Sequence, residues 1–385
     1  MLPRTLEATY DRILERVNAR GEGACRRVER ILRWLSHPYT VLNVRQLCEA
    51  ITINEGSTVL DTEDLVDVQD ILINCSSLVS LSADGTTVEF AHFTVGEYLR
   101  GIDPGRKPHL VRYRWDDATA NVYRAEICLT ALNFDALKSS CFHDISSLLA
   151  QLSRFPFYLH AAEAWNYYLD SGDSPKHLLN LATKLLHTTQ GAHFRNWRQL
   201  FILSRNSIRR VLWKHCNKSP SEPWLVPMVA DAYDSLDPDD EYNKDTWMIA
   251  QQIGEGSTPL HFAAMFHLLD FTELRTTPKT LINGQSPLGT PLHCALLGDD
   301  AVSSAWSMIV SIGGRRERSA KNRNCLATSV KLLLEAGADV HIDCRPLASG
   351  RCGTALIAYM VGELEAIFAA GAVLDKTTAE LILDD

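Results

Sequence analysis

The stretch 258-TPLHFAA-264 returns, slightly altered, as 290-TPLHCAL-296. Threonine is a favoured helix N-cap and proline suits the first helical turn, so each copy predicts the start of a short helix. In 332-LLLEAGADV-340 the leucines close a second helix, and Gly337 can take the left-handed conformation that ends it. The spacing from Gly337 to Gly371 is close to that from Thr258 to Thr290, so both motifs recur with a similar period.

A period of about 33 residues with a T-P-L-H core resembles the ankyrin repeat, a unit that stacks on its neighbours to form a solenoid. The residues of this repeat motif are Thr258, Pro259, Leu260, His261, Thr290, Pro291, Leu292, His293, Gly337 and Gly371. The resemblance implies that His261 and His293 take part in hydrogen bonding between helices, so both are predicted to be structural. The segment 281-LINGQSPLGTPLH-293 looks like the finger that joins one repeat to the next.

Partners of ankyrin arrays usually dock on the concave face and on the finger tips, because stacked repeats form a continuous surface there. The candidate partner-binding residues are Phe262, Met265 and Phe266 on the inner helix and Gln285, Ser286, Pro287 and Leu288 on the finger. For the aromatic residues, packing in the core is the alternative interpretation. The expected partners are other proteins.

The predicted array is irregular and holds about three degenerate repeats. An insertion at about 299–327 contains the basic stretch 315-RRERSAKNR-323. This stretch is interpreted as a contact for an acidic partner or a nuclear import signal, or else as a solvated loop or translated intron sequence. The last interpretation arises because 297-LG-298 would join naturally to 328-TSVKLLLEAGADV-340.

The first hundred residues predict helices followed by a short hairpin. Apolar residues recur at three- and four-residue spacing in the predicted helices 2–17, 24–36, 43–51 and 62–75. Asn43 and Thr62 are the expected starts of the last two. The runs 78-LVSLS-82 and 86-TTVEFAHFT-94 flank the turn 83-ADG-85, and Asp-Gly between two such runs is a strong hairpin signal. Helices followed by a hairpin in this order describe a winged helix.

A winged helix suggests DNA binding, but the charge of this chain argues against it. The helix that would enter the groove carries Glu63, Asp64, Asp67 and Asp70 and no lysine or arginine, so it would be repelled by a phosphate backbone. The whole chain has a formal net charge of −9. We therefore expect this module to contact proteins, with a DNA-binding regulator as the less favoured alternative.

Residues 105–245 are expected to be mostly helical, with the apolar spacing of packed helices. The predicted helices in this part are 120–134, 145–153, 155–169, 176–187 and 196–205. The acidic stretch 234-DSLDPDDEYNKD-245 is the preferred boundary before the repeats. The chain is therefore predicted to be mainly α, with a winged-helix module at 1–104, an α-helical connector at 105–245 and a short degenerate ankyrin-repeat solenoid at 246–385.

Three phrases resemble a known module: 2-LPRTLEATYDRIL-14, 31-ILRWLSHPYTVLNVRQLCEAITI-53 and 88-VEFAHFTVGEYLRG-101. They are similar to the winged-helix region that follows the NACHT nucleotide-binding domain in fungal NACHT–ankyrin proteins of the STAND type. This module is also known as the GPI inositol-deacylase winged-helix domain. In that family an upstream domain binds ATP with a glycine-rich phosphate loop, and no GxxxxGK[ST] occurs here. The resemblance implies the C-terminal part of such a protein with the nucleotide-binding domain absent.

Two hypotheses for function follow. The first is a non-catalytic protein–protein interaction scaffold, the regulatory or sensor half of a NACHT–ankyrin signalling protein. Its partners would be other proteins, with an upstream or separate NACHT domain among the candidates. The second is a fragment of a full-length signal-transducing ATPase whose phosphate-loop domain lies upstream of Met1.

Sequence signatures of catalysis are absent: no GxSxG, HExxH, GxGxxG or EF-hand pattern occurs. Cys141 with His143 and His341 with Cys344 are the nearest metal-like pairs, and neither has a second pair at zinc-site spacing. We therefore expect no enzyme activity, cofactor, metal or nucleic acid. The ten cysteines are scattered without a CxxC pair, and no signal peptide or long apolar run is present. These features predict a cytoplasmic protein, with the nucleus as the alternative, and no membrane contact.

Overall fold

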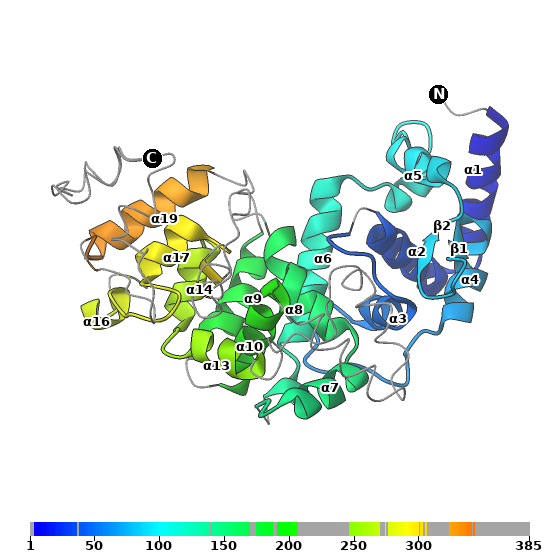
Figure 1. Cartoon of the computed structure of the whole chain (residues 1–385). Coiled ribbons are helices and arrows are strands. Elements are labelled where there is room, and N and C mark those ends of the chain that lie inside the picture. The colour runs from blue at the N-terminus through cyan, green and yellow to red at the C-terminus, as the bar shows by residue number, and fades with distance from the viewer. Residues whose placement is uncertain are drawn as a thin grey trace, which may run out of the picture. The chain divides into compact units, whose positions relative to one another are not determined.

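The computed structural model describes residues 4–36, 38–138, 141–169, 175–187, 191–206, 246–269, 274, 276–299, 301–302, 305, 323–340 and 342. The described part is mainly helical, as the sequence predicts, and it contains one two-stranded sheet (Figure 1). The described residues form two compact units, unit 1 up to Leu181 and unit 2 from Ala182 onward.

Unit 1 contains the predicted hairpin and most of the predicted helices of the first two thirds of the chain. Its elements are α1 (Arg4–Ala19), α2 (Glu22–Leu35), α3 (Val44–Thr52), α4 (Val68–Cys75), η1 (Ser76–Leu78), β1 (Val79–Leu81), β2 (Val88–Phe90), α5 (Phe93–Arg100), η2 (Pro108–Tyr113), α6 (Asp117–Leu132), η3 (Asp135–Leu137), α7 (Ile145–Arg154) and α8 (Phe157–Tyr168). The helix α9 (Lys176–His187) runs from unit 1 into unit 2.

The start of α3 is fixed by a reciprocal cap. The Asn43 side chain accepts the Gln46 N–H, and the Gln46 side chain accepts the Asn43 N–H. This arrangement is a capping box, in which each side chain satisfies a backbone donor of the first turn. The predicted start at Asn43 is therefore confirmed.

The start of α4 differs from the prediction. A helix beginning at Thr62 is wrong, because α4 begins directly after Asp67, whose carboxylate accepts the Asp70 N–H. Just upstream, the Val66 N–H donates to Thr52 Oγ1 at the end of α3. This long-range hydrogen bond removes the Val66 N–H from any helical ladder, so the helix forms only beyond it.

The hairpin is shorter than predicted. The strands β1 and β2 pair antiparallel with Val79 opposite Phe90. A strand continuing to residue 94 is wrong, because His92 is the N-cap of α5 and its Nδ1 accepts the Thr94 N–H. The chain therefore passes directly from the second strand into a helix.

Trp34 lies in the core of unit 1 and is 1% exposed. Its ring lies against Tyr123 of α6 and against Phe157 and Tyr168 of α8, with centroids 6.2, 5.2 and 6.3 Å away. Burial of such large aromatic side chains is a main source of stability in a core of this size. Because α6 packs on α2 and α8 packs on α3, unit 1 continues across the predicted boundary between residues 104 and 105.

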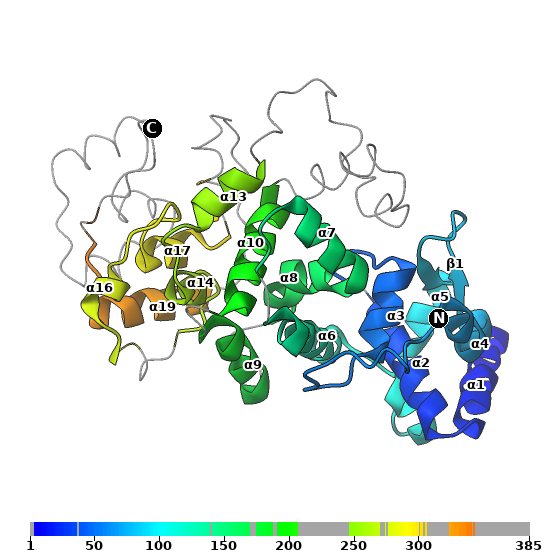
Figure 2. The same ribbon diagram turned by 90° about the horizontal axis from the view of Figure 1, so that it is seen from below.

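Unit 2 is built from short helices. Its elements are α10 (Ala192–Asn206), α13 (Thr246–Gly254), α14 (Pro259–Met265), α16 (Lys279–Ile282), α17 (Pro291–Leu297) and α19 (Arg323–Glu335). The helix α17 packs between α14 and α19, and Figure 2 shows the three together. On α10, the rings of Trp197 and Phe201 lie 5.1 and 6.1 Å from Phe262 of α14, so the first TPLH helix is packed on two sides.

Part of the predicted array lies outside the described residues. This applies to most of the insertion at 299–327, to residues 315–322 of its basic stretch, and to the chain after residue 342 with Gly371. The preferred boundary at 234–245 also lies outside them. The arrangement of the repeat motif is therefore described between Thr258 and residue 342.

Candidate protein-binding surface

The two copies of the TPLH phrase begin two helices in the same way. Thr258 is the N-cap of α14 and Thr290 is the N-cap of α17, and a proline follows each in the first turn. Each threonine N–H donates to Nδ1 of the histidine three residues later, at 3.1 Å for His261 and 3.3 Å for His293. The histidine thus takes the place that glutamate or glutamine has in the common capping box. The repeated TPLH motif therefore begins both helices with the same threonine–histidine cap.

His261 joins α14 to the segment that precedes α17. Its side chain is fully buried, and its Nε2 lies 3.1 Å from the carbonyl oxygens of Gly284 and Gly289. Carbonyl oxygens only accept and Nδ1 accepts the Thr258 N–H, so these partners assign the proton to Nε2. Burial lowers the pKa of His261 to about 4, which keeps the ring neutral near pH 7. His261 occupies a structural position inside the unit.

Within the predicted finger 281–293, residues 283–289 form a tight turn, and this part is called the finger below. Ser286 and Gly289 exchange backbone hydrogen bonds of 3.0 and 2.8 Å. Ser286 Oγ also accepts the Leu288 N–H at 3.2 Å, and Gly289 has a φ of 92°, which favours glycine. The turn is therefore specified by its own backbone and by one serine.

Asn283 braces the base of the finger. Its Nδ2 donates to the Gly337 carbonyl at 3.1 Å, and its Oδ1 accepts the Asp339 N–H at 2.8 Å. These bonds connect the finger to the chain that follows α19, far along the sequence. The sequence around Asn283 does not reveal this role, because an asparagine before a glycine signals a turn and says nothing of a distant partner.

Three of the predicted contact residues are core residues. Phe262, Met265 and Leu288 are 0, 2 and 2% exposed. The prediction that they contact a partner is corrected for these three, because a partner cannot reach them without opening the unit. The alternative interpretation, packing in the core, describes their place in the structure.

The other predicted contact residues reach the surface. Gln285 is exposed, and Ser286 and Pro287 are half-buried. Phe266 is also half-buried, and its ring lies 5.4 Å from Phe201 of α10. The accessible part of the candidate surface is therefore the tip of the finger together with the half-buried Phe266.

The helices α14 and α19 end alike. The second residue after each helix has a positive φ, 58° at His267 and 95° at Gly337. The N–H that follows donates to the carbonyl five residues back, at 2.8 Å from Leu268 and 2.9 Å from Ala338. This is a Schellman motif, which glycine favours and a histidine occupies with strain. The left-handed conformation predicted for Gly337 is confirmed.

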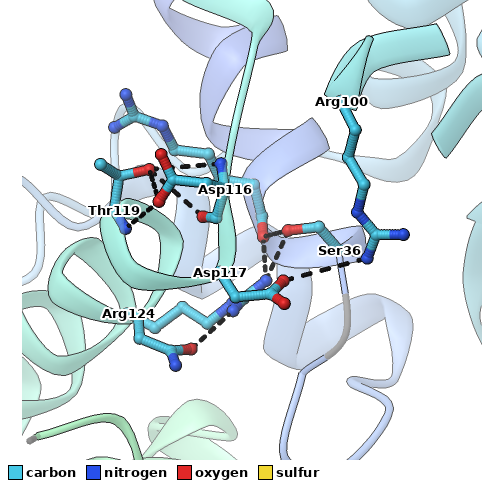
Figure 3. A network of polar contacts seen from close by, with 8 residues as sticks. Ser36, Arg100, Asp116, Asp117, Thr119 and Arg124 are labelled. Atoms are coloured by element: carbon cyan, nitrogen blue, oxygen red, sulfur yellow. Dashed lines mark hydrogen bonds and ion pairs between the residues drawn. The ribbon is translucent and has the colours of Figure 1, made fainter. Parts of the chain in front are cut away.

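A second polar centre lies in unit 1 around Arg124, which is 1% exposed. Its Nη2 donates to the Arg33 carbonyl and to Ser36 Oγ, both at 2.6 Å, and its Nη1 donates to Asn121 Oδ1 at 2.9 Å (Figure 3). Arg33 and Ser36 lie at the C-terminal end of α2, where the helix dipole is negative. The buried guanidinium therefore acts as a distant C-cap of α2.

Reactive groups are few in the described part of the chain. Burial raises the pKa of the Cys48 thiol to about 12, so that thiol stays protonated and unreactive. No group of three or more histidine, cysteine or acidic side chains that could hold a metal ion occurs among the described residues. Of the metal-like pairs, Cys141 and His143 belong to no such group, and His341 and Cys344 lie outside the described residues. No described helix is both long and apolar enough to cross a bilayer.

Comparison with known proteins yields one relationship. The chain is similar to "Azaphilone pigments biosynthesis cluster protein L" of Monascus ruber, with 27% identity over 218 residues. The similar region is 54% of this chain and 44% of that protein, so the chain spans less than half the length of this relative. The relative's name refers to a biosynthesis cluster and states no reaction. No family model and no solved structure matches the chain.

Proposed function

We propose that this chain is a non-catalytic scaffold that binds other proteins, and that residues 246–385 form a short degenerate ankyrin-repeat array. The observation that carries the proposal is the repeated cap at Thr258 and Thr290, which begins two like helices that pack together. His261 and Asn283 hold the finger between those helices through main-chain atoms. A braced finger suits docking, because little conformational entropy is lost when a partner binds.

The resemblance to fungal NACHT–ankyrin proteins extends this proposal from the repeats to the role of the whole chain. We infer that the chain is the regulatory or sensor part of a NACHT–ankyrin signalling system in the cytoplasm, with α1–α5 and the hairpin as its winged-helix module. Any ATP hydrolysis would then belong to a NACHT domain upstream or on a separate chain. The exposed Asp67 and Asp70 at the start of α4 favour a protein partner for this module over DNA.

The proposal is tested by affinity purification from native cells with a matched pair of variants. Gln285→Arg combined with Pro287→Ala changes the finger tip, and Asn180→Arg makes the same charge change on the exposed face of α9 in unit 1, outside both proposed binding surfaces. We expect the finger variant to lose specific partners that the Asn180→Arg variant retains, while both keep the urea midpoint of the unmodified chain. An identical set of partners for both variants would remove the finger from the proposal. A chain that captures no specific protein would contradict the scaffold function.

A further inference from the structure

Three side chains of α3 hold the junction between α7 and α8. The hydrogen bonds are Arg45 Nη2 to the Ser153 carbonyl at 3.1 Å, Gln46 Nε2 to the Pro156 carbonyl at 3.3 Å, and the Phe157 N–H to Glu49 Oε2 at 2.9 Å. Phe157 is the first residue of α8, so Glu49 satisfies one of the orphan donors at the start of that helix. A carboxyl group from another helix thus performs the role of an N-cap.

The Glu49 carboxyl group is unusual because it is 2% exposed. Desolvation raises its pKa to about 8, while the Phe157 N–H and the positive charge of Arg45 act in the opposite direction. The helices α2 and α8 also pack on α3. From α2, Arg30 donates to the Ile51 carbonyl and to Asn54 at the far end of α3.

From α8, the buried His160 is the titratable group one turn beyond Phe157. Burial lowers the pKa of His160 to about 3, so it stays neutral over the range in which Glu49 would ionise. The positive charge that acts on Glu49 is therefore that of Arg45 on its own helix.

We propose that Glu49 is a protonation-dependent latch between α3 and α8. A neutral carboxyl group accepts the Phe157 N–H and stays buried at little cost. A carboxylate must regain water, and it does so by opening the α3–α8 contact, which frees the first turn of α8. Because Phe157 lies against Trp34 in the core, the opening loosens the contact between the first hundred residues and the helices that follow them.

The test is amide hydrogen exchange at Phe157 and Tyr158 of the full chain, from about pH 5 to about pH 9.5, corrected for base catalysis. We expect the protection of these amides to fall by up to about tenfold per pH unit between about pH 5 and pH 8, and to level off above about pH 8, where the closed state has also lost its proton. In Glu49→Gln, which is neutral at every pH, protection should be independent of pH. The control Glu126→Gln, a half-buried acid on α6, should keep the pH dependence of the unmodified chain.

Two results would overturn the latch. One is constant protection of Phe157 and Tyr158 across the whole range in the unmodified chain. The other is an unchanged pH dependence in Glu49→Gln. If that variant does not fold, carbon NMR of the Glu49 carboxyl group in the unmodified chain decides the matter. Titration near pH 8 supports the latch, and titration near the ordinary value of about 4.3 refutes it.

Discussion

Replacing His261 by alanine tests whether the repeated phrase builds the unit. The imidazole accepts the Thr258 N–H and donates to the Gly284 and Gly289 carbonyls, and it is fully buried. Each lost hydrogen bond costs about 1 kcal/mol net, and the cavity left by the ring costs about 1 kcal/mol more. We therefore expect His261→Ala to lower the free energy of unfolding of unit 2 by about 4 kcal/mol.

The assay is urea denaturation followed by hydrogen–deuterium exchange of peptides that cover α14 and the finger, since the chain has two units and a single global signal would mix them. The matched control is His177→Ala on α9, whose side chain is 54% exposed. The control should change the stability by less than about 0.5 kcal/mol. A loss of less than about 1 kcal/mol for His261→Ala would refute the role given to this histidine.

Three further outcomes follow from the same contacts. His267→Gly should stabilise unit 2 by about 0.5–1 kcal/mol, because glycine tolerates the φ of 58°, and Gly337→Ala should destabilise it by about 1 kcal/mol; thermal unfolding measures both. Asn283→Ala should lower the free energy of unfolding of unit 2 by about 2 kcal/mol, because two hydrogen bonds are lost. Amide exchange at Asp339 should become faster, and unchanged exchange there would contradict the bracing role of Asn283. The folded pKa of His261, about 4, lies below the unfolded value of 6.5, so its contribution to stability is complete above pH 6.5 and declines as pH falls towards 4. The urea midpoint of unit 2 should fall as the pH is lowered over that range, by the equivalent of at most about 3 kcal/mol in the free energy of unfolding. The same decrease in pH should lower the midpoint of His261→Gln by a smaller amount.

Local signals in the sequence predicted much of the fold. The cap at Asn43, the helix starts at Thr258 and Thr290 and the left-handed Gly337 all depend on partners within a few residues. Such contacts leave a pattern of fixed spacing, and a pattern can be read from one sequence. The wrong helix start at Thr62 has the opposite cause. The hydrogen bond from the Val66 N–H to Thr52 Oγ1 joins the segment before α4 to the end of α3, and this distant contact decides where α4 begins.

The residues that the sequence did not reveal act on main-chain atoms far along the chain. Asn283 binds the backbone 54 residues away, Arg124 binds it 91 residues away and Glu49 binds it 108 residues away. A main-chain partner carries no residue type, so no pairing motif marks these contacts. The candidate surface was overestimated for a related reason. Phe262 lies on a helix of only seven residues that packs against both α10 and α17, so that side chain has no solvent-facing side.

The way the finger is held also bears on what it can do. Its supports are the Gly284 and Gly289 carbonyls on one side and the backbone around Gly337 on the other. None of these contacts uses the side chains of Gln285 or Pro287 at the tip. Substitutions at the tip therefore change the chemistry offered to a partner at little cost in folding stability, whereas a change at His261 alters both. A surface whose shape is fixed by the backbone and whose side chains can be changed fits the protein-binding function proposed for this chain.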